Sequence, residues 1–95
     1  MNITGSNMTT SKQPVILVPN VWVDLYAETG ITVGAKIIVQ NNGSITARLS
    51  ESVGEPISTT GYNSIAPFKF LTSADTPVGA WAYCTSNARL QVEEA

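Results

Sequence analysis

The chain has 95 residues, of which 43% are hydrophobic and only 13% are charged, about half the charged share of ordinary soluble domains. This length fits one domain with a small core, and a surface poor in charge suits contact with neighbouring subunits. The net charge is −2 and the five basic residues lie singly along the chain, which argues against a nucleic-acid partner and against an anionic membrane.

Residues 1–13 are polar and show almost no apolar periodicity. Such a segment forms no core, so we predict an extended N-terminal arm that precedes a single β-domain at residues 14–95. Ordering a chain costs about 1–2 kcal/mol per residue, and we therefore expect the arm to become ordered by gripping another protein. No stretch resembles a signal peptide, which predicts synthesis in a reducing cytoplasm.

After the arm, short β-branched and aromatic runs alternate with Gly, Pro and Asn. This pattern predicts an all-β protein, a small antiparallel β-sandwich or barrel of six or seven short strands with under ~10% helix. The first two strands are expected at residues 15–18 and 21–27. In the second run the aliphatic residues alternate with Trp22 and Tyr26, which predicts that both aromatic side chains face outward.

Residues 35–51 are expected to form a β-hairpin. A three-residue loop at 41–43 places Val39 opposite Ile45 and keeps apolar side chains on one face of the hairpin. A two-residue loop would place apolar residues opposite polar residues on the same face. The three-residue length predicts a type I turn with a G1 bulge and places Gly43 at positive φ.

A loop is predicted for residues 52–61, followed by a broken strand at 62–71. Pro67 has no amide hydrogen for a ladder, so it marks an edge strand or a bend. Another turn is expected at residues 74–79.

The last pair of strands is predicted as a hairpin around the loop 86–87. This hairpin places Trp81 opposite Val92 and Tyr83 opposite Leu90, so these bulky side chains are expected to form the core face. The alternating small residues are expected on the opposite face.

Catalytic chemistry has little support in the residue types present. Histidine is absent, so triads of the Ser-His-Asp kind are impossible, and the single cysteine, Cys84, forms no intramolecular disulfide or cysteine cluster. Pairs of carboxylates such as Asp24 with Glu28 are interpreted as solvated surface charge. We therefore predict no enzyme, no catalytic residue, no cofactor and no metal site.

Several segments resemble small virion structural proteins of tailed bacteriophages: Trp22-Val23-Asp24-Leu25-Tyr26, Thr29–Gly34, Ile37–Ser44, Gly79–Tyr83 and Arg89–Glu93. The resemblance implies a β-rich accessory protein, either a capsid decoration or cement protein or a component of the neck, tail or fibre. Such proteins are commonly symmetric oligomers, often trimers, and often hold the shell with an N-terminal arm. It carries over no residue-level role.

These expectations combine into a capsid decoration protein of the virion that docks on the particle through its arm and one β-face. Its partners would be copies of itself and capsid or tail proteins. The predicted interface residues are Met1, Ile3, Met8, Trp22 and Tyr26. A tail, neck or fibre component with a carbohydrate-binding surface is the alternative, because exposed aromatic rings also stack on sugars.

Overall fold

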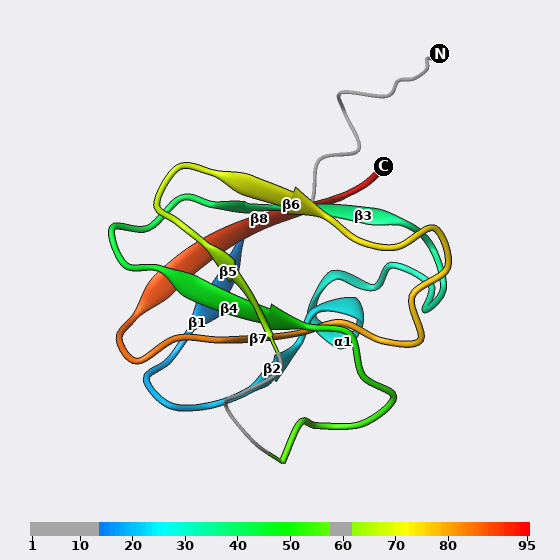
Figure 1. Ribbon diagram of the computed structural model, residues 1–95, viewed down its shortest axis with the longest axis horizontal. Coiled ribbons are helices and arrows are strands. Elements are labelled where there is room, and N and C mark those ends of the chain that lie inside the picture. Colours follow the sequence, from blue (N-terminus) through cyan, green and yellow to red (C-terminus); the bar gives the residue numbers. More distant parts are fainter. Residues whose placement is uncertain (1–13, 58–61) are drawn as a thin grey trace.

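The computed structural model describes residues 14–57 and 62–95, and it confirms the prediction of an all-β sandwich. Two antiparallel four-stranded sheets lie face to face, in the orders β1-β8-β3-β6 and β2-β7-β4-β5 (Figure 1). The strands are β1 (Val15–Leu17), β2 (Val23–Asp24), β3 (Ile37–Asn41), β4 (Ala47–Ser50), β5 (Asn63–Ile65), β6 (Phe70–Thr72), β7 (Trp81–Tyr83) and β8 (Ala88–Glu94). The described residues thus form a sandwich of eight strands, where six or seven were expected.

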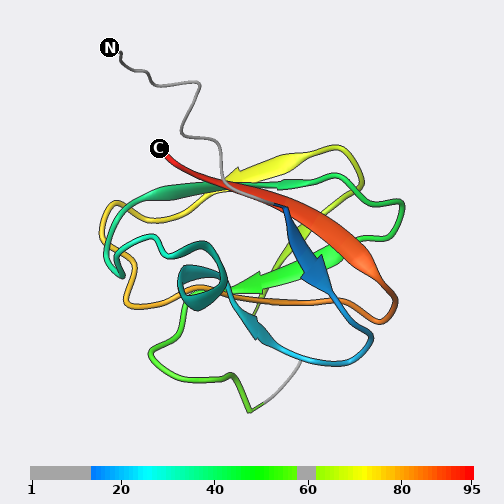
Figure 2. The same ribbon diagram turned by 180° about the vertical axis from the view of Figure 1, so that it is seen from behind.

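The strands are wound in a nested order. The first strand pairs with the last, β2 with β7, β3 with β6 and β4 with β5, while β3–β8 and β4–β7 pairs complete the two sheets. This order defines a jelly roll, in which two Greek keys are folded into a double sheet. The edge strands β1 and β2 lie on one side of the sandwich and β5 and β6 on the other (Figures 1 and 2).

Neither predicted hairpin exists, because β3 and β4 belong to different sheets and so do β7 and β8. The predicted inward faces of β3 and β4 are nevertheless correct, since Ile37, Val39, Ala47 and Leu49 are buried. A period of two fixes which side chains face the core, but it does not identify the neighbouring strand. The loops at 42–46 and 84–87 cross between sheets that pack ~10 Å apart, instead of closing tight turns.

The prediction for Gly43 is also wrong, because the described glycines with positive φ are Gly30 and Gly34. The close approach of neighbouring atoms explains instead why this position has no side chain. A Cβ atom at Gly43 would lie 3.3 Å from Asn41 Oδ1 and 3.4 Å from the backbone nitrogen of Arg89.

The face predicted for β7 is reversed. Ala82 and its small neighbours Ala80 and Cys84 are buried, whereas Trp81 and Tyr83 lie half-buried on the outer face. The bulky residues of the other strands fill most of the space between the sheets. Small side chains on β7 complement them, as close packing of facing layers requires.

Residues 21–27 do not form one long strand. After the two-residue β2, the chain enters the helix α1 (Leu25–Thr29), in which Asp24 is the N-cap: its Oδ1 accepts hydrogen bonds from the backbone nitrogens of Tyr26 at 3.0 Å and Ala27 at 3.2 Å. Gly30 ends the helix at φ 77°. These start and stop signals outweigh the alternating pattern and rotate the side chains that follow Asp24.

A buried carboxamide joins the two sheets. Asn41, at the end of β3, donates from Nδ2 to the carbonyl oxygens of Ile45 and of Ile65 on β5, both at 2.8 Å. Its Oδ1 accepts from the backbone nitrogen of Gly43 at 2.8 Å. The side chain is fully buried, so each of these bonds replaces water.

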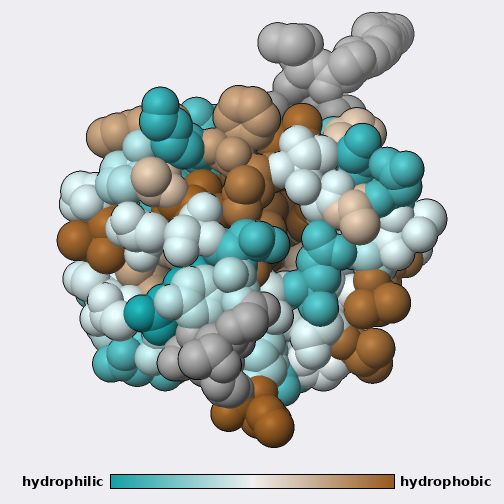
Figure 3. All heavy atoms as spheres, in the orientation of Figure 1, coloured by the Kyte–Doolittle hydropathy of each residue, from teal (hydrophilic) through white to brown (hydrophobic). Residues whose placement is uncertain are grey.

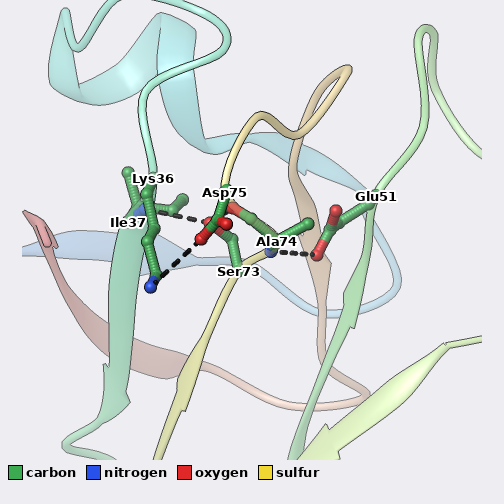
Figure 4. A network of polar contacts seen from close by, with 6 residues as sticks. All are labelled: Lys36, Ile37, Glu51, Ser73, Ala74 and Asp75. Atoms are coloured by element: carbon green, nitrogen blue, oxygen red, sulfur yellow. Dashed lines mark hydrogen bonds and ion pairs between the residues drawn. The ribbon is translucent and has the colours of Figure 1, made fainter.

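At the other end of β3, a second polar network holds the β6–β7 loop (Figure 4). The Ser73 hydroxyl accepts from the Ile37 nitrogen at 2.9 Å and donates to the Ala74 carbonyl oxygen at 2.9 Å. The Ala74 nitrogen in turn donates to Glu51 Oε2 at 3.1 Å. Because Glu51 follows β4, this network also links the two sheets.

We expect Asn41→Asp to lower the free energy of unfolding by ~3 kcal/mol at pH 7, since a carboxylate cannot donate to the Ile45 and Ile65 carbonyls. Burial beside carbonyl oxygens raises the pKa of the new carboxyl, so the loss should grow as pH rises above its unfolded value near ~4. Urea unfolding at pH 4 and pH 7 measures both effects. Asn63→Asp, at an exposed position on β5, should change stability by under ~0.5 kcal/mol; equal losses in the two variants would contradict the role of Asn41.

Candidate functional site

The structure describes only two of the five predicted interface residues. Met1, Ile3 and Met8 lie outside the described residues. Trp22 and Tyr26 are only 8% and 3% exposed, so the predicted outward contact through these two rings is wrong.

Both aromatic residues instead support the fold. The Tyr26 hydroxyl donates to the Ala35 carbonyl oxygen at 2.6 Å, and burial is the main cause that raises the pKa of this phenol above its ordinary value. Trp22 packs against Tyr83 with ring centroids 5.1 Å apart. The outer faces of the two sheets carry other exposed or half-buried apolar and charged side chains.

The outer face of the sheet β1-β8-β3-β6 carries a shallow hollow of about 470 Å³. We call this sheet surface the cleft face; its hollow lies where β3 ends and β8 begins. The hollow is lined by Ile16, Asn42, Gly43, Ser44, Phe68, Asn87, Ala88 and Arg89. Apolar side chains and an arginine therefore share one concave surface.

Phe68 forms one side of the hollow in a costly backbone conformation. It is the third residue of a turn in which the Lys69 nitrogen donates to the Ala66 carbonyl oxygen at 3.0 Å, and its φ is 63°. A type II turn places Gly or Asn there, and a bulky side chain costs roughly 1–2 kcal/mol. The ring is nevertheless 70% exposed, so burial of this side chain does not offset the cost.

Arg89 lies opposite Ile16 in the β1–β8 register. Among the described residues the ion pair found joins Lys36 to Asp75, so the exposed Arg89 pairs with no carboxylate there. An arginine between exposed apolar side chains is typical of interaction surfaces. The hollow suits a partner that presents a carboxylate beside an apolar side chain.

The outer face of the other sheet, which we call the aromatic face, gathers half-buried rings around an arginine. The Arg48 guanidinium carbon lies 4.9 Å from the Tyr62 ring centroid and 5.3 Å from that of Tyr83. Trp81 lies on the same face, opposite Asp24 on β2. Cation–π contacts hold these rings in place.

The side of the molecule seen in Figure 3 mixes apolar residues with polar ones instead of presenting one large apolar area. Within residues 14–57 and 62–95, no group of three or more histidine, cysteine, aspartate or glutamate side chains is placed to hold a metal ion. No helix in those ranges has the length and apolar character needed to cross a membrane. Comparison of the chain with protein-family models, curated proteins and solved structures finds no match.

Sequence reasoning missed Phe68 and Arg89 as site residues. It placed Phe68 in the broken strand at 62–71, but the structure divides this segment into β5 and β6, which belong to different sheets. The bend expected at Pro67 is confirmed, and both strands are edge strands. Pro67 was the available signal, because proline favours the second position of a type II turn and would put Phe68 at the third.

We expect Phe68→Gly to leave the free energy of unfolding unchanged or to raise it by up to about 1 kcal/mol, because glycine adopts positive φ without strain. Phe70→Gly removes a ring that is 62% exposed from β6, where the backbone is extended, and should destabilise by about 1 kcal/mol. Thermal unfolding compares the two variants. A larger loss for Phe68→Gly than for Phe70→Gly would contradict the strained turn.

Proposed function

We propose that this protein is a structural component of a bacteriophage virion, a capsid decoration or cement protein that docks on the particle through residues 1–13 and the cleft face. The observation that carries the proposal is Phe68, a strained residue that displays its ring beside Arg89, which pairs with no carboxylate in the described part of the chain. Strain that persists in a folded protein is a marker of a functional site. An exposed apolar ring beside an arginine is typical of a binding surface.

Two further properties support an assembly role. Jelly rolls form many viral capsid domains and also lectins, so the winding is compatible with both candidate functions, although a fold alone assigns neither. The low charged fraction of 13% suits a surface that neighbouring subunits cover. The sequence resemblance to small virion structural proteins favours the particle over a free lectin.

Incorporation into particles tests this proposal. Deletion of residues 1–13 and Phe68→Gly should each reduce occupancy on assembled particles by about tenfold or more, while circular dichroism shows a folded β-domain. Val53→Gly removes an apolar side chain that is 83% exposed in the β4–β5 loop and should leave occupancy unchanged. Full occupancy of the two test variants would overturn the proposed docking.

The aromatic face favours a second candidate, a carbohydrate-binding component of the tail or fibre. The rings of Trp81 and Tyr62 are partly exposed, and Asn20 accepts a hydrogen bond from the Tyr83 hydroxyl at 2.9 Å nearby. Rings beside polar groups are typical of sugar-binding surfaces. Trp81 takes the place of Trp22 in this hypothesis, because Trp22 is buried.

We expect glycan binding, if it occurs, to be lost in Trp81→Ala and kept in Phe68→Gly, because Trp81 lies on the aromatic face and Phe68 lines the hollow of the cleft face. A glycan array probed with the wild type and both variants makes the comparison. The absence of binding by the wild type would remove this candidate, and binding that depends on Trp81 would favour it over capsid decoration.

A further inference from the structure

The cleft face has two ends of opposite charge. Arg89 and Glu93 both lie on its outer surface, because Leu90 and Val92 alternate with them and are buried. They are four residues apart on an extended strand, which separates them by ~13 Å. A single chain therefore cannot pair Arg89 with Glu93.

The end near Arg89 is the receiving end. It holds the hollow of about 470 Å³, flanked by the exposed side chains of Ile16 and Phe68. A ligand that fits here supplies a carboxylate to the guanidinium and an apolar group to the space beside it.

The end near Glu93 carries that chemistry. Glu93 on β8 lies opposite Ile38 on β3, so a carboxylate and a branched apolar side chain stand side by side on the cleft face. The Glu93 carboxylate accepts a hydrogen bond from Gln91 Nε2 at 2.7 Å, which holds it along the strand. This face thus contains both a hollow and a group suited to fill it.

The spacing of the two ends is symmetric. Gln40 and Gln91 form a cross-strand pair midway between them, since Ile38 and Asn42 lie two residues from Gln40, just as Arg89 and Glu93 lie two residues from Gln91. A rotation of 180° about an axis through this pair, in the plane of the face and perpendicular to the strands, exchanges the two ends.

We propose that the cleft face binds the cleft face of a second copy of this chain around that axis. Glu93 of each copy meets Arg89 of the other, and Ile38 of each enters the hollow of the other beside Phe68. Such a contact is isologous, so one pair of complementary ends is used twice and the assembly closes as a dimer. Phe70 lies opposite Gln40 and therefore meets its own copy near the axis.

This inference rests on the proposed function and deepens it: the neighbour that the cleft face contacts in the particle is a second copy of the chain, and contact with the shell is left to residues 1–13. It replaces the trimer implied by the sequence resemblance with a two-fold pair. An acidic segment of a different protein is the competing occupant, and it would require no symmetry between the two ends.

Charge reversal tests the reciprocal pairing. In sedimentation velocity the wild type should form a dimer, while Arg89→Glu and Glu93→Arg should each weaken it by about tenfold or more, because like charges then meet twice across the axis. The double variant Arg89→Glu/Glu93→Arg should regain the dimer. A monomeric or trimeric wild type, or a double variant no better than the single variants, would overturn the proposal.

Cross-linking supplies a readout that does not depend on the strength of the ion pairs. Gln91→Cys places a thiol near the axis and should give a disulfide-linked dimer on mild oxidation, whereas the exposed loop variant Ser86→Cys should not. The native Cys84 is buried and does not compete. Equal cross-linking of the two variants would contradict the axis.

The solution state and the particle occupancy of the wild type together separate this inference from the proposed function. A wild type that is monomeric in solution yet occupies particles fully would overturn the two-fold contact and leave the decoration role intact. A wild type that dimerises through Arg89 and Glu93 but never joins particles would overturn the decoration role and leave the contact intact.

Discussion

The hydrogen bonds of Asn41 are the constraint on which the rest of the structure depends. Its carboxamide joins β3 to β5 in the opposite sheet, and its backbone holds the turn at Phe68: the Phe68 nitrogen donates to the Asn41 carbonyl oxygen at 2.7 Å, and the Asn41 nitrogen donates to the Lys69 carbonyl oxygen at 2.9 Å. Its Oδ1 also positions Gly43. One buried residue therefore fixes two sides of the hollow relative to the core.

This arrangement explains how the fold tolerates strain at its surface. The positive φ of Phe68 costs about 1–2 kcal/mol, and the backbone hydrogen bonds between the turn and Asn41 help to offset this cost. Asn20 also has positive φ, but asparagine adopts it at low cost. Among the described residues with bulky side chains, only Phe68 has positive φ. This strained residue distinguishes the cleft face from an ordinary sheet surface.

Local patterns in the sequence predicted the class of the fold and much of its core, but not its pairing. Alternation placed Val39 and Leu49 inward correctly because each strand has one buried face. It failed at Tyr26, where the Asp24 cap and Gly30 favour a helical turn, and at Tyr83, where small residues fill the core side. The site could not be predicted for a related reason. Phe68 and Arg89 line the same hollow because β6 and β8 both pair with β3, and no local pattern in the sequence indicates that strand order.

The nested winding also determines when the protein can fold during synthesis. Strands β7 and β8 are inner strands of the two sheets, and each has a neighbour on both sides. Until the ribosome has released the segment that contains them, β1 and β2 have no partners and β3 and β4 each lack one. Pairing between such distant segments is slow, so the emerging chain must stay soluble without a finished core until β8 is available and then fold in one cooperative step.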